Sequence, residues 1–436
     1  MRDFLPDDVR RRNYVIGIVE DVYRRYGFEP LETPALENIE TLTGKYGDEG
    51  AKLIFKVLRR GEHESSGETD LALRYDLTVP LARVVAEHRG KLPKFFKRYQ
   101  IQPVWRADRP ARGRFREFYQ CDVDCMGSRS PVVEVEVCGA VSEVLTTLGF
   151  EQFTVRVNHR QVLTALLTNA GVAPDHHAHA LVAIDKLDKI GREGVEKELT
   201  ARGIASESHG RLLDWMGASS RPDLLDWLER ESSLHDDHAR AAFQNVREIL
   251  LLGQDSAAAG HLTFDPSLAR GLSYYTGAIM EINVPDLAGS LGGGGRYDGL
   301  IGMFCGEEIP ACGFSLGLER ILVVMTERGM FPEHVQSGTA DVLVTIFDRD
   351  GIAPSLQLAR QLRGTGLSVE VYPEADKLGK QFKYAASRGT RFVTVLGSDE
   401  RAAGQVTLKN LENSEQSTVS LADASGWLKK RLSPSH

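Results

Sequence analysis

A strongly basic stretch in the first third of the chain, residues 94–127, places the tightest constraint on the fold. Two segments rich in Phe, Tyr, Val and Ile flank a short turn that contains Pro110 and Gly113. This pattern predicts an antiparallel β-hairpin. Residues 89–116 hold ten Lys or Arg and one carboxylate, Asp108, which gives them a net charge of +9 in a chain of net charge −8. A local positive field in an acidic protein predicts an anionic ligand here.

The second strand of this hairpin carries a row of polar side chains. Because successive strand residues point to opposite faces, one face is expected to hold Arg116, Phe118, Gln120, Asp122 and Asp124. Such a row belongs either to a solvated surface or to the wall of a polar pocket. From these residues alone, an exposed charged hairpin is as good an interpretation as a ligand site.

The composition predicts a globular protein of two or three domains for 436 residues. Its 42% hydrophobic and 26% charged residues are ordinary values. No run of 18 apolar residues and no apolar signal core are found, so we expect no membrane span and a cytoplasmic location. The five cysteines form no CxxC pair, which favours reduced thiols over disulfides or a zinc site. The acidic balance argues against indiscriminate nucleic-acid binding but allows a local basic surface that binds RNA.

Asp76 stands where a predicted strand hands over to a predicted helix. Residues 70–76 alternate as a strand does, and residues 77–87 read as a helix. Such junctions often carry binding residues. Taken alone, the simpler interpretation is that Asp76 or Thr78 caps the helix.

A second informative stretch, residues 267–282, has an arginine, Arg270, before the tyrosine pair Tyr274 and Tyr275 and an apolar strand. Without further context, Arg270 reads as a loop arginine beside a strand. Residues 289–299 then place four glycines in a row, where backbone can approach a ligand closely. The run matches neither a GxxxxGK[ST] phosphate loop nor a dinucleotide fingerprint.

A single arginine, Arg320, interrupts the apolar helix predicted within residues 313–325. It is costly there unless it is paired, so a structural ion pair is the simple alternative to ligand binding. The histidine-rich run Asp175, His176, His177 and His179 is too tightly spaced for a tetrahedral zinc site, and we interpret it as a solvated helix start.

Composition divides the chain into segments. We expect a catalytic domain in two parts, residues 1–173 and 255–330, interrupted by a helical insertion at 174–254. A linker, 331–340, leads to a small α/β domain at 341–436, in which strands and helices alternate.

These motifs resemble the class II aminoacyl-tRNA synthetases and, in detail, the histidyl-tRNA synthetases. The hairpin VWRADRP…GRFREFYQCDVDCMG is similar to their motif 2, and the helix, strand and Pro34 near the N-terminus to motif 1. Gly313, Gly317 and Arg320 fit motif 3, while LRYDLTVPLAR and RGLSYY are similar to histidine-specific signatures. The resemblance implies an α+β catalytic domain, with an antiparallel sheet flanked by helices, a helical insertion and a C-terminal α/β anticodon-binding domain.

The implied function is that of a histidine–tRNA ligase, which activates L-histidine with ATP and transfers it to tRNA(His). The resemblance implies Mg²⁺ with the ATP, no dedicated protein metal site, and a homodimer. It implies Arg106 and Arg270 as catalytic residues on the α-phosphate, and ATP contacts from Arg106, Arg114 and Arg320. The implied histidine contacts are Asp76, Thr78, Arg106, Gln120, Asp124, Arg270, Tyr274 and Tyr275.

The sequence departs from the family pattern at Ser273, where Asp is common, and at Asp124, where Glu is more frequent. Two alternatives remain open. One is a non-catalytic, synthetase-like regulatory subunit of ATP phosphoribosyltransferase, although such proteins erode the active-site motifs and commonly lack the C-terminal domain. The other is an RNA-binding sensor of the kind appended to stress kinases, although no kinase segment is present.

Overall fold

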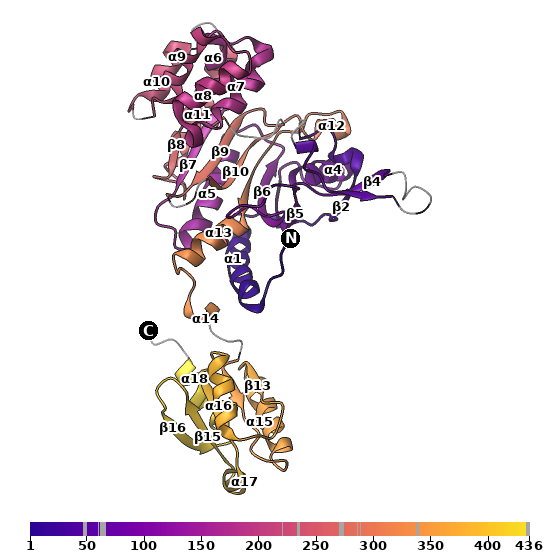
Figure 1. Ribbon diagram of the computed structural model, residues 1–436, viewed down its shortest axis with the longest axis vertical. Helices are drawn as coiled ribbons and strands as arrows, with labels where there is room; N and C mark the ends of the chain where they lie inside the picture. Colours follow the sequence, from indigo (N-terminus) through magenta and orange to yellow (C-terminus); the bar gives the residue numbers. More distant parts are fainter. Residues whose placement is uncertain are drawn as a thin grey trace. The chain divides into compact units, whose positions relative to one another are not determined.

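The computed structural model describes residues 1–46, 50–59, 61, 67–219, 221–232, 236–269, 274–285, 287, 289–336 and 340–432. The chain forms two compact units, Met1–Met330 and Phe331–His436, and each is considered by itself. Figure 1 follows the chain through both units.

The first unit is built on a mixed eight-stranded sheet, which is mostly antiparallel and flanked by helices, as predicted (Figure 1). Only the pairs β1–β5 and β7–β8 are parallel. The strand order is β1-β5-β6-β11-β10-β9-β7-β8. The strands are β1 (Glu29–Pro30), β5 (Phe96–Trp105), β6 (Glu117–Met126), β7 (Thr154–His159), β8 (Leu262–Phe264), β9 (Ala278–Asn283), β10 (Ser290–Arg296) and β11 (Ala311–Gly317).

The basic hairpin is confirmed as β5 and β6, which pair from Trp105 opposite Glu117 to Phe96 opposite Met126. Its turn closes around Gly113, whose φ of 68° favours glycine. Both strands lie in the interior of the sheet, and Gln120, Asp122 and Asp124 on the polar face of β6 are buried.

Helices cover one face of this sheet. The N-terminal helix α1 (Pro6–Arg25) buries Val15, Val19 and Val22 on one face, and the chain reverses at Gly27, where φ is 75°. Helix α5 (Val132–Thr147) packs on β6 and β11 and contacts α1, which in turn contacts α13 (Leu318–Glu327). The two faces of the large sheet therefore differ: α5 packs against one face, and the other carries the polar row of β6.

A small three-stranded sheet holds the predicted junction at Asp76. It consists of β2 (Leu36–Asn38), β4 (Thr69–Leu73) and β3 (Lys56–Leu58), with β4 in the middle. Helix α4 (Thr78–His88) follows β4 and packs against α2 (Ile39–Leu42) and α12 (Gly302–Cys305). Asp76 is thus fixed between a strand and a helix that both have buried neighbours.

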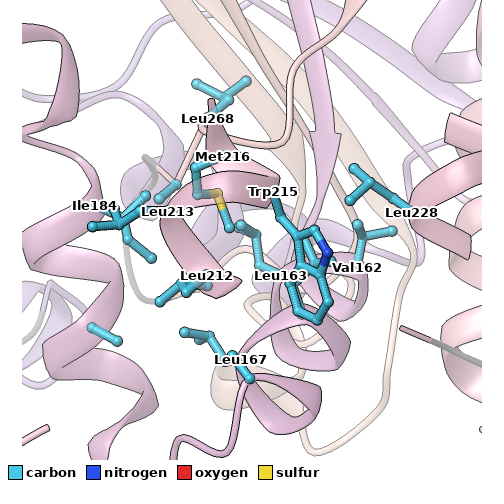
Figure 2. Close-up of a cluster of buried hydrophobic side chains, with 14 of the residues drawn as sticks. Val162, Leu163, Leu167, Ile184, Leu212, Leu213, Trp215, Met216, Leu228 and Leu268 are labelled. Carbon is cyan, nitrogen blue, oxygen red and sulfur yellow. The ribbon is translucent and has the colours of Figure 1, made fainter. Parts of the chain in front are cut away.

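The segment between β7 and β8 is helical. Its core joins α6 to the later helices through Leu163, Leu167, Trp215, Met216 and Leu228 (Figure 2). The histidine-rich run forms the short helix η2 and the start of α7, as expected. The helices are α6 (Arg160–Asn169), η2 (Pro174–His176), α7 (His177–Ile184), α8 (Leu187–Ala201), α9 (Ser206–Met216), α10 (Leu224–Ser232) and α11 (Asp237–Gly253).

The second unit has a five-stranded sheet in the order β13-β12-β14-β15-β16. Its first three strands and flanking helices match the expected α/β pattern, while the polar hairpin β15–β16 and helix α17 were not predicted. The elements are α14 (Glu333–Gln336), β12 (Val342–Val344), α15 (Ile352–Gly364), β13 (Val369–Val371), α16 (Leu378–Ser387), β14 (Phe392–Val395), α17 (Ser398–Ala403), β15 (Gln405–Asn410), β16 (Gln416–Ser420) and α18 (Ala424–Leu432).

No helix within the described ranges is long and apolar enough to cross a membrane. All five cysteines are unpaired, as predicted.

Candidate active site

A cavity of about 310 Å³ opens over the polar face of the large sheet. Its volume is typical of a small-molecule site. Eight of the ten predicted site residues line it: Asp76, Thr78, Arg106, Arg114, Gln120, Tyr274, Tyr275 and Arg320. The wall also includes residues that were not predicted, among them Asp108, Phe115, Phe118, Leu268, Ile279, Glu281, Ser290, Leu291, Gly293, Ser315 and Glu319.

Asp76 supplies a buried carboxylate to this cavity. Its Oδ1 accepts hydrogen bonds from the Tyr46 hydroxyl at 3.0 Å and the Val79 amide at 3.1 Å, and its Oδ2 accepts from the Tyr274 hydroxyl at 3.3 Å. The Val79 bond is the predicted helix cap. Burial raises the pKa of Asp76, while these donors and the charge of Arg106 oppose that rise. Capping and ligand binding are therefore compatible at this residue.

Arg106 is held flat at the cavity wall. Its guanidinium lies 4.3 Å from the ring centre of Tyr75 and 5.1 Å from that of Phe118. Its Nε donates to the carbonyl of Tyr75 at 3.0 Å, which directs the two terminal nitrogens away from that carbonyl. Stacking keeps an arginine ordered while its remaining donors can meet an anion.

Gln120 presents an acceptor to the cavity. Its Nε2 donates to Ser315 Oγ at 2.7 Å, and its buried Oε1 has no hydrogen-bond partner among the described residues. A buried acceptor without a partner is destabilising in isolation, so a donor from a ligand would improve this arrangement.

The tyrosine pair stands at the inner end of the cavity. The rings of Tyr274 and Tyr275 meet edge to face with centroids 5.0 Å apart. The Tyr274 hydroxyl interacts with Asp76 and with the side chain of Thr78. Burial raises the pKa of Tyr275, so its hydroxyl stays protonated and can donate a hydrogen bond.

Two further arginines line the outer part. Arg114 pairs with Asp108 through Nε at 3.1 Å but keeps about half of its side chain exposed. Arg320 donates from Nε to the carbonyl of Gly113 at 3.4 Å and from Nη1 to that of Ser290, which ties α13 to the hairpin turn and to β10. These hydrogen bonds to backbone carbonyls help to accommodate an arginine within an apolar helix.

The run of glycines forms strand β10, which the sequence left undefined. A Cβ at Gly295 would lie 2.9 Å from the Tyr275 ring, so the ring rests on bare backbone. Gly293, two residues earlier, lies on the same side of the strand, and a Cβ there would meet only Met280 O, at 3.3 Å. Because the glycines of β10 have no side chains, the space over this strand stays open and forms part of the cavity.

Two predicted residues are not among the described residues that line the cavity. Arg270 lies outside the described residues. Asp124 is buried below the wall, where its Oδ1 accepts from the Tyr297 hydroxyl at 2.5 Å and its Oδ2 lies 2.9 Å from Arg98 Nη2. Its role in binding stays a prediction.

Sequence reasoning missed three neighbours of the predicted residues. Tyr46 donates to Asp76 from 30 positions away, and no local pattern singled it out. Ser315 and Glu319 flank Gly317 of the motif 3 match, which was a usable signal. Glu319 accepts from the Tyr119 amide at 2.9 Å, and burial raises its pKa to about 7.

A buried carboxyl beside Asp124 gives a pH-dependent prediction. Burial raises the pKa of Asp122 from 3.8 to about 7, against the effect of Arg98. Asp122 stabilises the fold most below pH 3.8, and this contribution disappears as the pH rises through about 7. The free energy of unfolding should therefore fall between about pH 4 and 7, and fall less in Asp122→Asn. Urea unfolding at several pH values measures this, and an equal slope in the variant would contradict it.

Comparisons with known proteins identify the family of this chain. The family model "Histidyl-tRNA synthetase" matches residues 1–321, and the model "Anticodon binding domain" matches residues 342–431. The chain belongs to the histidyl-tRNA synthetase family. It is 42% identical to a histidine–tRNA ligase of Gloeobacter violaceus, covering 99% of this chain and 97% of the relative. A ligase from Christiangramia forsetii is 40% identical, with 98% of each chain covered.

Solved structures of the family share the fold. A histidyl-tRNA synthetase from Nostoc sp. PCC 7120 superposes with a TM-score of 0.84 at 31% identity, covering 99% of this chain and 98% of the other. A structure from Bacillus halodurans, described as an ATP phosphoribosyltransferase regulatory subunit/histidyl-tRNA synthetase, has a TM-score of 0.74 at 22% identity, covering 90% and 96%. At that identity the second likeness concerns the fold alone.

Proposed function

We infer that this synthetase is a histidine–tRNA ligase, and we propose residue roles for the first step of the reaction, the activation of histidine. One observation carries the proposal: Asp76, Gln120 and Tyr275 share a single cavity with Arg106, Arg114 and Arg320. The cavity therefore offers hydrogen-bonding groups suited to histidine beside cations suited to a nucleotide. An intact set of these groups and an anticodon-binding domain at 342–431 favour the ligase over a regulatory subunit.

In the first step, the histidine carboxylate attacks the α-phosphate of ATP, the bond to pyrophosphate breaks, and histidyl-adenylate forms. Negative charge builds up on the α-phosphate as an anionic nucleophile approaches. We assign Arg106 to that phosphate, because a stacked guanidinium with terminal donors available is already oriented for it. Arg270 is the proposed second cation, and Arg114 and Arg320 are proposed to contact the rest of the nucleotide.

Mg²⁺ would arrive with ATP and would offset the negative charge of its phosphates. No group of three or more His, Cys, Asp or Glu side chains that could hold a metal ion occurs in the described part of the chain. Glu319 fits one contact to it, because its buried Oε1 at the cavity has no hydrogen-bond partner among the described residues.

The ammonium of histidine is assigned to Asp76 and to the Oε1 of Gln120, with Thr78 as a further contact and with Tyr274 holding Asp76 in place. The imidazole is assigned to Tyr275 as a donor and to Asp124 as an acceptor from the layer beneath. Burial is the main cause that raises the pKa of Tyr275, and the charge of Asp124 is the largest cause after it, which supports the proximity of these two residues. Such paired recognition rejects analogues that lack either ring nitrogen.

The active form is proposed to be a homodimer. Large apolar side chains stay exposed beside the predicted motif 1 and its neighbours, and such exposure marks interaction surfaces. They are Leu36, Leu58, Phe95 and Val132, each between 42% and 58% exposed. We place the protein in the cytoplasm, where its substrate tRNA(His) is used and where unpaired cysteines are normal.

Histidine-dependent ATP–pyrophosphate exchange by the full chain tests this function. We expect Asp76→Asn to raise the KM for histidine by about 10- to 100-fold, the loss of one charged hydrogen-bond partner, and to change the KM for ATP much less. Asn keeps an acceptor for the Val79 amide, so the helix cap is preserved. Exchange that does not depend on histidine in the unmodified protein would refute the function, and equal changes in both KM values would refute the role of Asp76.

A further inference from the structure

Below the cavity lies a buried charged cluster made of Arg98, Asp122 and Asp124, none of which lines the cavity. The three side chains are between 0% and 2% exposed. In the sequence, Arg98 is one of the ten basic residues within 89–116. Its complete burial removes it from any surface that could attract an anion, so its charge must serve another purpose.

Strand register explains how the cluster forms. Arg98 on β5 stands opposite Asp124 on β6, and Asp124 stands opposite Gly313 on β11. Directly paired residues of neighbouring strands point to the same face. A Cβ at Gly313 would lie 1.8 Å from Asp124 Oδ1, so the carboxylate occupies the space above a bare backbone position. Arg98 therefore fixes Asp124 from one side while β11 leaves it room on the other.

Arg98 also reaches the segment that carries Asp76. Its Nη2 lies 2.9 Å from Asp124 Oδ2 and 3.8 Å from Asp122 Oδ2, and donates at 3.4 Å to the carbonyl of Leu77. Leu77 directly follows Asp76 in the chain. Nη2 of Arg98 therefore contacts Asp124, which is proposed to bind the imidazole of histidine, and Leu77, which is next to the residue proposed to bind its ammonium.

We propose that Arg98 is a positioning residue for histidine selection, which sets the spacing between Asp76 and Asp124 without touching the substrate. The proposal rests on the function given above. Two carboxyl groups share this one guanidinium, and breaking a buried pair by removing one partner leaves an uncompensated charge. Asp124 would then move relative to Asp76, and a displacement of about 1 Å in a site costs on the order of 100-fold in rate.

Tyr297 provides a second, independent contact to the carboxylate of Asp124. Its buried hydroxyl donates to Asp124 Oδ1, and Tyr297 does not line the cavity. If orientation of Asp124 controls histidine selection, then loss of this hydroxyl should have the same kind of effect as loss of the Arg98 charge. A purely structural ion pair would make no such link.

The test compares kinetic constants for histidine and ATP in pyrophosphate exchange. Arg98→Met keeps side-chain length and removes the charge, and Tyr297→Phe removes only the hydroxyl. Each is expected to raise the KM for histidine about tenfold or more and to change the KM for ATP less than about twofold. In Arg98→Met, adding Asp122→Asn should recover part of the histidine affinity, because one excess carboxyl is then gone.

Arg83→Met is the matched control. Arg83 pairs with the buried Glu37 at 2.8 Å, away from the cavity, so its loss should lower stability without changing the ratio of the two KM values. If Arg98→Met does not fold, the KM values of Tyr297→Phe and Arg98→Lys still test the proposal. Equal changes in both KM values, or no change in folded variants, would overturn the role of Arg98. The unmodified protein would still exchange pyrophosphate, so that result leaves the proposed function standing.

Discussion

Arg106→Ala is expected to lower the rate of histidine-dependent ATP–pyrophosphate exchange by about 100- to 1,000-fold, the usual cost of removing one preorganised donor to a developing oxyanion. The reason is geometric. Tyr75 and Phe118 stack on the guanidinium, and the Tyr75 carbonyl holds its Nε, so the side chain is oriented before any ligand binds. The kcat should fall more than the KM for either substrate rises, because the charge it faces is greatest in the transition state.

Two further variants separate charge from geometry at this position. Arg106→Lys keeps the charge but loses the planar fork, so it should recover only a small part of the rate. Arg129→Ala removes an exposed arginine that pairs with Glu308 outside the cavity, and should leave exchange unchanged. Arg106→Ala with a near-normal kcat would remove Arg106 from the phosphate-binding group.

Gly313→Ala is expected to damage histidine binding and folding together. The added Cβ would lie 1.8 Å from Asp124 Oδ1 and 2.9 Å from the carbonyl of Val123, which is backbone and cannot move freely. Displacing Asp124 should lower kcat/KM for histidine by about 100-fold. Overpacking of the sheet should cost about 1 to 3 kcal/mol of unfolding free energy. Exchange kinetics and urea unfolding measure the two effects.

A double variant identifies the cause. Adding Asp124→Ala to Gly313→Ala removes the group that the new methyl strikes, so stability should return in part, as expected for residues in contact. Histidine affinity should not return with it. Gly299→Ala is the control, because a Cβ there has no neighbour within 4 Å. Strictly additive stability losses at 313 and 124 would show that the two residues do not interact as described.

The sequence predicted the hairpin well because its signals are local. The alternation of apolar residues around Pro110 and Gly113 is complete within 34 positions, and strands β5 and β6 pair as expected. The sequence also predicted the helical character of the insertion and the first strands of the C-terminal unit. The hairpin β15–β16 was not predicted, because most of its residues are polar and only Val406 and Leu408 of β15 are apolar and buried in the core.

Contacts between distant segments escaped prediction. Tyr46 donates to Asp76, and Arg98 meets Leu77, but no spacing rule links residues from separate elements. The glycine run was visible, yet its use became clear only when Tyr275 was found against Gly295. A glycine in the sequence indicates that no side chain restricts the backbone at that position. The group that packs into the space left without a side chain comes from another part of the chain.

By itself, the sequence determined the faces of the strands and the residue types gathered on them, because side-chain alternation is a property of extended backbone. It correctly placed Gln120, Asp122 and Asp124 on one face of β6. Only the tertiary structure decided their depth: Gln120 reaches the cavity, while Asp122 and Asp124 lie beneath it with Arg98. Depth depends on what neighbouring strands and loops place over each position, and burial then raises the pKa values of Asp122 and Asp124.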